Sequence, residues 1–161
     1  MTDREFFIYT LGDEAPRFDG VFKALPIDKL DYKPDPKSRS AAELAATFSN
    51  EAGTFVTFMT TGAIDVAQMA GGPSDIPGIA DSFAKSIQAT VAKAQSMTEE
   101  DWETECKMTM GDKELWKTTK GKMAWGLLFD LIHHRGQLAT YIRPMGGKVP
   151  AIYGPSADSS N

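Results

Sequence analysis

The segment from about Lys120 to Met145 constrains the fold most, because its apolar residues recur at helical spacing along its whole length. Gly146 and Gly147 follow it and are typical of a helix C-terminus. This segment is therefore predicted to be a long amphipathic helix, the most apolar of the chain. Its stripe advances in steps of four and three through Leu127, Leu131, His134, Leu138 and Tyr141.

Two further segments carry helical signals at their starts. Ser40-Ala41-Ala42-Glu43 fits a capping box, in which the Ser hydroxyl and the Glu carboxylate each accept a hydrogen bond from an exposed backbone N–H. It predicts a second helix that runs to about Gly62. Pro77 suits the first turn of a third helix, whose apolar residues again recur at steps of four and three.

Two other segments depart from a regular helical pattern. Near the N-terminus, Pro16 interrupts an apolar helical stripe and predicts a kink or a restart near Asp13. From Trp102 to Met110, apolar or small residues alternate with polar ones, which is typical of a half-buried strand. Gly111-Asp112 would then be a turn, with Leu115-Trp116 pairing back as a hairpin; an extended loop is the alternative.

Four amphipathic helices with one long connection predict an all-α fold, a four-helix bundle of the up-and-down type. The extended segment would form a short insertion before the last helix. A length of 161 residues suits a single domain over residues 1–161. With 42% hydrophobic and 24% charged residues, the chain has the composition of a soluble globular domain.

Composition also excludes several classes of function. The 17 Lys and Arg residues against 22 Asp and Glu residues give a formal net charge of −5, which argues against nucleic acid as a partner. No apolar run is long enough to span a membrane, and Met1–Glu5 lacks the features of a secretory signal, so we expect a cytoplasmic protein. The single cysteine, Cys106, is expected to be a small buried residue rather than a nucleophile.

Polar residues interrupt the apolar faces of two predicted helices. Asp130 and His134 are four residues apart and so share one helix face, with His133 also in reach of Asp130. Thr47 and Glu51 have the same spacing on the second helix. A carboxylate and an imidazole so placed can chelate a divalent metal; alternatively, Asp130 only orients and charges His134. With two histidines in the whole chain, a site of three histidines is excluded.

The last helix resembles that of the DinB-like family of small bacterial four-helix-bundle proteins, often described as metal-dependent hydrolases. The resemblance rests on Leu127–Leu138, which contains His133-His134-Arg135-Gly136-Gln137, and on the Thr140–Arg143 end with its Gly146-Gly147 stop. The segment Lys37–Ala45 is similar to the start of the second helix in that family.

This resemblance implies an altered metal site. Members of the family usually hold a divalent metal, nickel or zinc, with one histidine on the second helix and two, four residues apart, on the last. Here His134 matches, but Asp130 and Thr47 stand at the other two positions. Glu51, one turn beyond Thr47, would be a substitute ligand or a general base.

Two functions of different classes are consistent with these residues. The first is a metal-dependent hydrolase or thiol transferase acting on a small molecule. The second is a metal-free binding or scaffold protein, in which Asp130, His133, His134 and Thr47 line a small-molecule pocket that Tyr153 covers. The resemblance also implies a homodimer, because relatives often associate through their helices.

Overall fold

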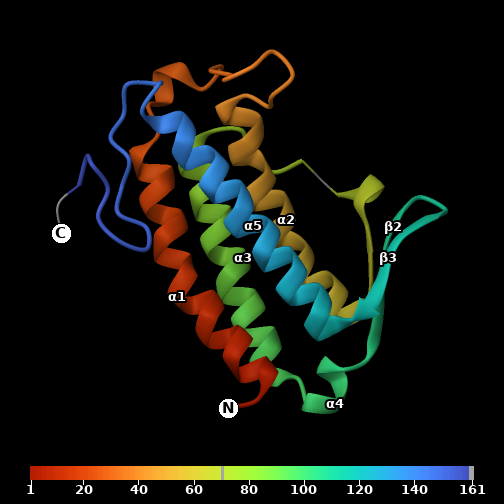
Figure 1. Ribbon diagram of the computed structural model, residues 1–161. Helices are drawn as coiled ribbons and strands as arrows, with labels where there is room; N and C mark the ends of the chain where they lie inside the picture. Colours follow the sequence, from red (N-terminus) through yellow and green to blue (C-terminus); the bar gives the residue numbers. More distant parts are fainter. Residues whose placement is uncertain (70, 160–161) are drawn as a thin grey trace.

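Four long helices lie side by side and form most of the molecule (Figure 1). The computed structural model describes residues 1–69 and 71–159. A one-turn helix, α4 (Glu99–Trp102), and two 3-10 turns, η1 (Ile27–Lys29) and η2 (Val66–Gln68), lie in the connections. The long helices are α1 (Asp3–Ala24), α2 (Ala41–Thr61), α3 (Ile76–Ser96) and α5 (Lys120–Ile142).

The ends of α2 form as the sequence predicts. The Ser40 side chain accepts a hydrogen bond from the backbone N–H of Glu43, and the Glu43 carboxylate accepts one from the backbone N–H of Ser40. At the other end, Gly62 adopts a left-handed conformation with φ of 75°, which glycine reaches without steric cost. The predicted capping box is therefore confirmed.

Helix α1 does not restart near Asp13, so that part of the prediction is wrong. The helix is continuous from Asp3 to Ala24, with Pro16 inside it. Proline removes one backbone hydrogen bond from a helix. On either side of Pro16, Leu11 and Phe18 are each 1% exposed and lie in the same core, so burial of one face holds the helix together across the proline.

The order of the helices differs from the predicted up-and-down arrangement. Phe48 and Phe83 occupy equivalent positions early in α2 and α3, and their ring centroids are 6.2 Å apart. These two helices therefore run in the same direction, and residues 62–69 and 71–75 lie in the connection that returns from the end of α2 to the start of α3 (Figure 1). The prediction fails because this connection is long enough to reach back to the end where α2 begins.

A small three-stranded sheet makes the fold mostly rather than entirely helical. Its strands β1 (Ala63–Asp65), β2 (Glu105–Met110) and β3 (Lys113–Thr119) lie in that order. Strands β2 and β3 pair antiparallel, which confirms the hairpin and excludes the extended loop. Strand β1 pairs parallel with β2 and was not predicted, because three residues are too few to show an alternating pattern.

The core runs the length of the long helices. At one end Phe18, Phe22, Phe48 and Phe83 pack with ring centroids 4.8 to 6.2 Å apart. Under the sheet, Cys106 is 2% exposed, and burial raises the pKa of its thiol to about 11, so it is a poor nucleophile. Within residues 1–69 and 71–159, none of the helices combines the length and the apolar character that a membrane crossing requires.

Candidate metal centre

Helices α2 and α5 bring Glu51, Asp130 and His134 together. The imidazole Nε2 of His134 lies 3.5 Å from Oδ2 of Asp130 and 3.7 Å from Oε1 of Glu51. One potential ligand atom from each residue lies within 4.8 Å of the other two. The i, i+4 spacing on α5 accounts for the first pair, and the packing of α2 against α5 adds the second carboxylate.

The cluster is buried on the side of α2 and open on the side of Asp130. The side chains of His134 and Glu51 are 12% and 17% exposed, whereas that of Asp130 is 51% exposed. Glu51 Oε2 is fully buried and has no hydrogen-bond partner among the described residues. Burial, followed by the negative charge of Asp130 and a hydrogen bond with it, raises the pKa of Glu51 to about 8.

The orientation of His134 is fixed by a neighbour on its own helix. Its Nδ1 lies 2.8 Å from the amide oxygen Oε1 of Gln137. An amide oxygen can only accept, so Nδ1 carries the proton in this contact, and Nε2 of the neutral ring is left with its lone pair. That nitrogen is the one that faces the carboxylates of Glu51 and Asp130.

These three groups fit a divalent cation. The lone pair of His134 Nε2 faces carboxylate oxygens of Asp130 and Glu51 at 3.5 and 3.7 Å, beyond the roughly 2.7–3.2 Å of a hydrogen bond, and these contacts repel unless a proton or a cation lies between them. One of the three residues, Glu51, has a second oxygen, Oε2, that lacks any partner in the described structure. An imidazole nitrogen with two carboxylate oxygens is a donor set that zinc, manganese and iron accept.

Comparison with known proteins agrees with the fold. The family model of the DinB family matches residues 5–161. The chain belongs to the DinB family. No curated protein matches its sequence.

Two solved structures share this DinB fold. A DinB-like protein from Bacillus subtilis is 22% identical, with a TM-score of 0.70, over 96% of this chain and 99% of that one. A DinB-like protein from Bacillus cereus is 19% identical, with a TM-score of 0.73, over 92% of this chain and 97% of that one. At these identities the likeness supports the fold alone.

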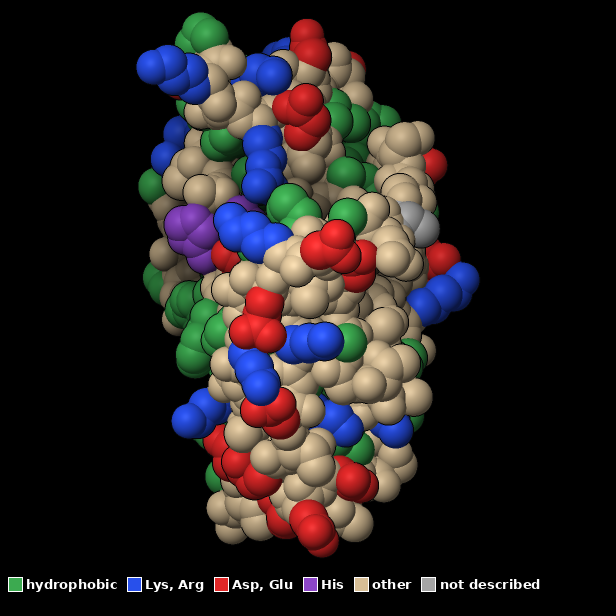
Figure 2. Space-filling view, turned by 90° about the vertical axis from the view of Figure 1, so that its right-hand side faces the viewer, with side chains coloured by type: hydrophobic (Ala, Val, Ile, Leu, Met, Phe, Trp, Pro, Cys, Tyr) green, Lys and Arg blue, Asp and Glu red, His purple; other side chains and the backbone are tan. Residues whose placement is uncertain are grey.

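The other candidate residues of this DinB-family chain lie around the cluster without joining it. The Thr47 hydroxyl donates to the backbone carbonyl of Glu43 and accepts a 2.9 Å hydrogen bond from Nη1 of Arg39. His133 is exposed, with its ring centroid 5.4 Å from that of His134. Figure 2 shows histidine side chains in purple at the surface, beside basic and acidic ones.

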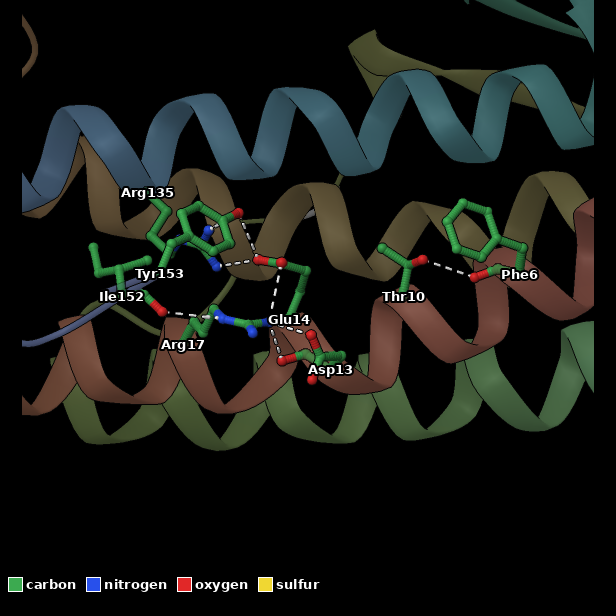
Figure 3. A network of polar contacts seen from close by, with 8 residues as sticks. All are labelled: Phe6, Thr10, Asp13, Glu14, Arg17, Arg135, Ile152 and Tyr153. Carbon is green, nitrogen blue, oxygen red and sulfur yellow. Dashed lines mark hydrogen bonds and ion pairs between the residues drawn. The ribbon is translucent and has the colours of Figure 1, made fainter. Parts of the chain in front are cut away.

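Tyr153 lies in a separate polar network between α1, α5 and the C-terminal segment (Figure 3). Arg135, which is 1% exposed, donates 2.5 Å hydrogen bonds to Oε2 of Glu14 and to the Tyr153 hydroxyl. The Tyr153 hydroxyl in turn donates to Glu14 at 3.0 Å. Tyr153 therefore bonds with Arg135 rather than with His134. The sequence signals that Glu14 is buried, because it falls between Leu11 and Phe18 in an apolar stripe, but nothing in it identifies Arg135 or Tyr153 as the partner.

A surface cavity of about 340 Å³ adjoins His134. It lies between the loop before α2 and the C-terminal half of α5, and of the three candidate ligands it is His134 that lines it. Its lining residues are Ser38, Arg39, Leu44, His134, Gln137, Thr140 and Tyr141. Arg39, Gln137 and Tyr141 did not emerge as site residues from the sequence, because nothing in their spacing relates the loop to α5.

Proposed function

We propose that this DinB-family chain is an enzyme that holds one divalent cation between Glu51, Asp130 and His134. The observation that carries the proposal is the convergence of these three acceptors, where Glu51 also has a buried oxygen without a partner in the described residues. The mixed nitrogen and oxygen donor set favours zinc or manganese over softer ions. The reaction we propose is hydrolysis of a small molecule or transfer of a thiol.

Each residue contributes a distinct property. When bound, a divalent ion lowers the pKa of water or of a thiol and polarises a carbonyl group. His134 presents Nε2 in a fixed direction, because Gln137 holds its Nδ1–H. Glu51 has a pKa of about 8 in the metal-free protein, so its carboxyl group must release a proton before it can ligate the ion at neutral pH. Asp130 is half exposed and lies at the side from which a substrate can approach.

The second candidate is a metal-free binding protein. It is favoured by the raised pKa of Glu51, because a proton held by Glu51 and shared with Asp130 would relieve the repulsion in the cluster without an ion. The two candidates differ in how the protein responds when metal is removed and returned. In the first, activity is lost and restored; in the second, no activity depends on metal.

The experiment compares metal-stripped and metal-loaded protein. Protein treated with EDTA and dialysed would be titrated calorimetrically with Zn²⁺ and with Mn²⁺. It would then be assayed for hydrolysis of simple esters and for transfer of a small thiol to an electrophile. We expect one of these activities to require the ion and to disappear in His134→Ala but persist in His133→Ala, the matched control. Failure of the wild-type protein to bind either ion would refute the proposal.

A further inference from the structure

The loop before α2 places three basic side chains next to the candidate metal centre. A second surface cavity, of about 510 Å³, is lined by Lys33, Lys37 and Arg39 together with residues of the loop and of α2. It shares Ser38 and Arg39 with the cavity that contains His134. The two cavities therefore form adjoining spaces with Arg39 between them, and Figure 2 shows basic side chains next to the histidines.

Two of these cations form no ion pair among the described residues, although Glu43 also lines the second cavity. Lys33 pairs with Glu43 at 3.3 Å. Within the described part of the chain, no carboxylate lies within ion-pair distance of Lys37 or Arg39, although the protein as a whole carries a net charge of −5. Unpaired positive charge beside a cavity attracts anions locally.

Arg39 is held in place by two helices. Its guanidinium donates to the Thr47 hydroxyl on α2, and its backbone carbonyl accepts a 3.2 Å hydrogen bond from the Tyr141 hydroxyl on α5. Tyr141 is itself 8% exposed and packs edge-on against Tyr32. The Tyr141 contact holds the backbone of Arg39, and the Thr47 contact restricts its exposed guanidinium, which lowers the conformational entropy lost when it binds a carboxylate or a phosphate.

A second hydrogen-bond donor, Gln137, lines the cavity that contains His134. Gln137 uses its amide oxygen to accept from His134 Nδ1, so its NH₂ group remains to donate. At the position where the resemblance expects a histidine ligand, Thr47 instead holds Arg39. This position of α2 therefore positions an arginine side chain.

We propose that Arg39, supported by Lys37 and Gln137, binds the oxyanion of a small anionic substrate, a carboxylate or a phosphate ester, next to the His134 cluster. This inference rests on the proposed function, because it names the class of substrate that would reach that metal centre. Arg39 and Gln137 provide the hydrogen bonds, and Lys37 adds charge. Thr47 and Tyr141 are positioning residues that fix Arg39.

The test measures binding of two simple anions. Inorganic phosphate and succinate would each be titrated calorimetrically into Mn²⁺-treated and EDTA-treated protein. We expect Arg39→Gln to lower the affinity for the more tightly bound anion about tenfold, with Mn²⁺ and with EDTA alike, because a charge-assisted hydrogen bond is lost. Lys85→Gln, which removes the same charge from a lysine paired with Asp81 on α3, should leave the affinity unchanged.

Thr47 variants separate positioning from charge. Thr47→Val keeps Arg39 but removes the hydroxyl that holds its guanidinium. We expect this variant to bind the anion about threefold more weakly than the wild type, since only preorganisation is lost. Thr47→Ser retains the hydroxyl and should restore the wild-type affinity.

The outcomes distinguish this inference from the proposed function. Tighter phosphate binding indicates a phosphate ester, and tighter succinate binding indicates a carboxylate. Binding of Mn²⁺ with no anion binding, or with anion binding that Arg39→Gln leaves unchanged, would overturn the inference while the metal centre stands. Anion binding that depends on Arg39 in a protein that binds neither Mn²⁺ nor Zn²⁺ supports the anion site and refutes the metal-dependent enzyme.

Discussion

Burial changes the acidity of one residue, Glu51. Its carboxyl group lies between helices, close to Asp130, and its pKa rises from the ordinary 4.5 to about 8. The folded chain therefore holds a proton at Glu51 more tightly than the unfolded chain does. Between pH 4.5 and 8 the unfolded state has released that proton while the folded state retains it, so stability falls as the pH rises across this window.

Without metal, the free energy of unfolding should therefore depend on pH differently in the wild type and in Glu51→Gln. With EDTA present, the free energy of unfolding of the wild-type protein should fall from pH 5 to pH 8 relative to that of Glu51→Gln. The difference in slope should not exceed about 1.4 kcal/mol per pH unit, the value for one proton. Urea unfolding at pH 5, 6, 7 and 8 would measure it. Parallel profiles for the two proteins would show that Glu51 has an ordinary pKa.

The candidate ligands could be predicted from the sequence because each follows from helical geometry. Asp130 and His134 share a face through their spacing, and Glu51 falls inside the apolar stripe of α2. The role of Arg39 could not be predicted, because it depends on a loop that α5 holds in place through Tyr141. The position of Tyr153 was also beyond the sequence, since its partners Glu14 and Arg135 lie far from it along the chain.

At the scale of elements, the helices were more predictable than their order. Caps and apolar stripes define the ends of α2 and α5 locally, as at Ser40 and Gly62. The direction of α3 depends instead on the connection that follows α2, which includes β1. Pairing of β1 with β2 joins segments that are distant along the chain, and a strand of three residues leaves no local pattern that reveals it.

Two glycines in α5 provide a matched test of how this helix packs. A Cβ at Gly121 would overlap Nε1 of Trp102, a side chain with no exposed surface and therefore little room to move. A Cβ at Gly136 would meet nothing within 4 Å. We expect Gly121→Ala to destabilise the protein by about 1–3 kcal/mol through overpacking. Gly136→Ala should stabilise it by about 0.5–1 kcal/mol, because alanine favours the helix.

Urea unfolding of the two alanine variants beside the wild type measures both effects. If Trp102 packs closely over Gly121, the free energy of unfolding falls in Gly121→Ala and rises in Gly136→Ala. Equal changes would mean that Trp102 does not pack closely over Gly121.

At the scale of the whole molecule, one polar network joins the first helix, the last helix and the C-terminal segment. Arg135 and Glu14 form its buried ion pair, and Arg17 adds a hydrogen bond to Glu14 and one to the backbone carbonyl of Ile152 (Figure 3). A buried charge that loses its partner is costly, whereas an apolar pair of similar volume often costs little.

Removal of Arg135 alone should therefore cost more than removal of the pair. We expect Arg135→Met to lower the free energy of unfolding by about 3 kcal/mol, because Glu14 keeps only the partly exposed Arg17 and the Tyr153 hydroxyl. The double variant Glu14→Leu with Arg135→Met should recover most of that loss. A double-mutant cycle by urea unfolding checks this, and simple additivity of the two single effects would contradict it.

The metal content of the protein shows whether Glu51, Asp130 and His134 form a metal centre. Untagged wild type, His134→Ala and His133→Ala would be incubated with Zn²⁺ or Mn²⁺, dialysed and analysed by elemental mass spectrometry. The convergence of Glu51, Asp130 and His134 predicts about one ion per chain in the wild type and in His133→Ala, and almost none in His134→Ala. Metal far below one ion per chain in the wild type, or equal amounts in all three proteins, would contradict a metal centre at this position.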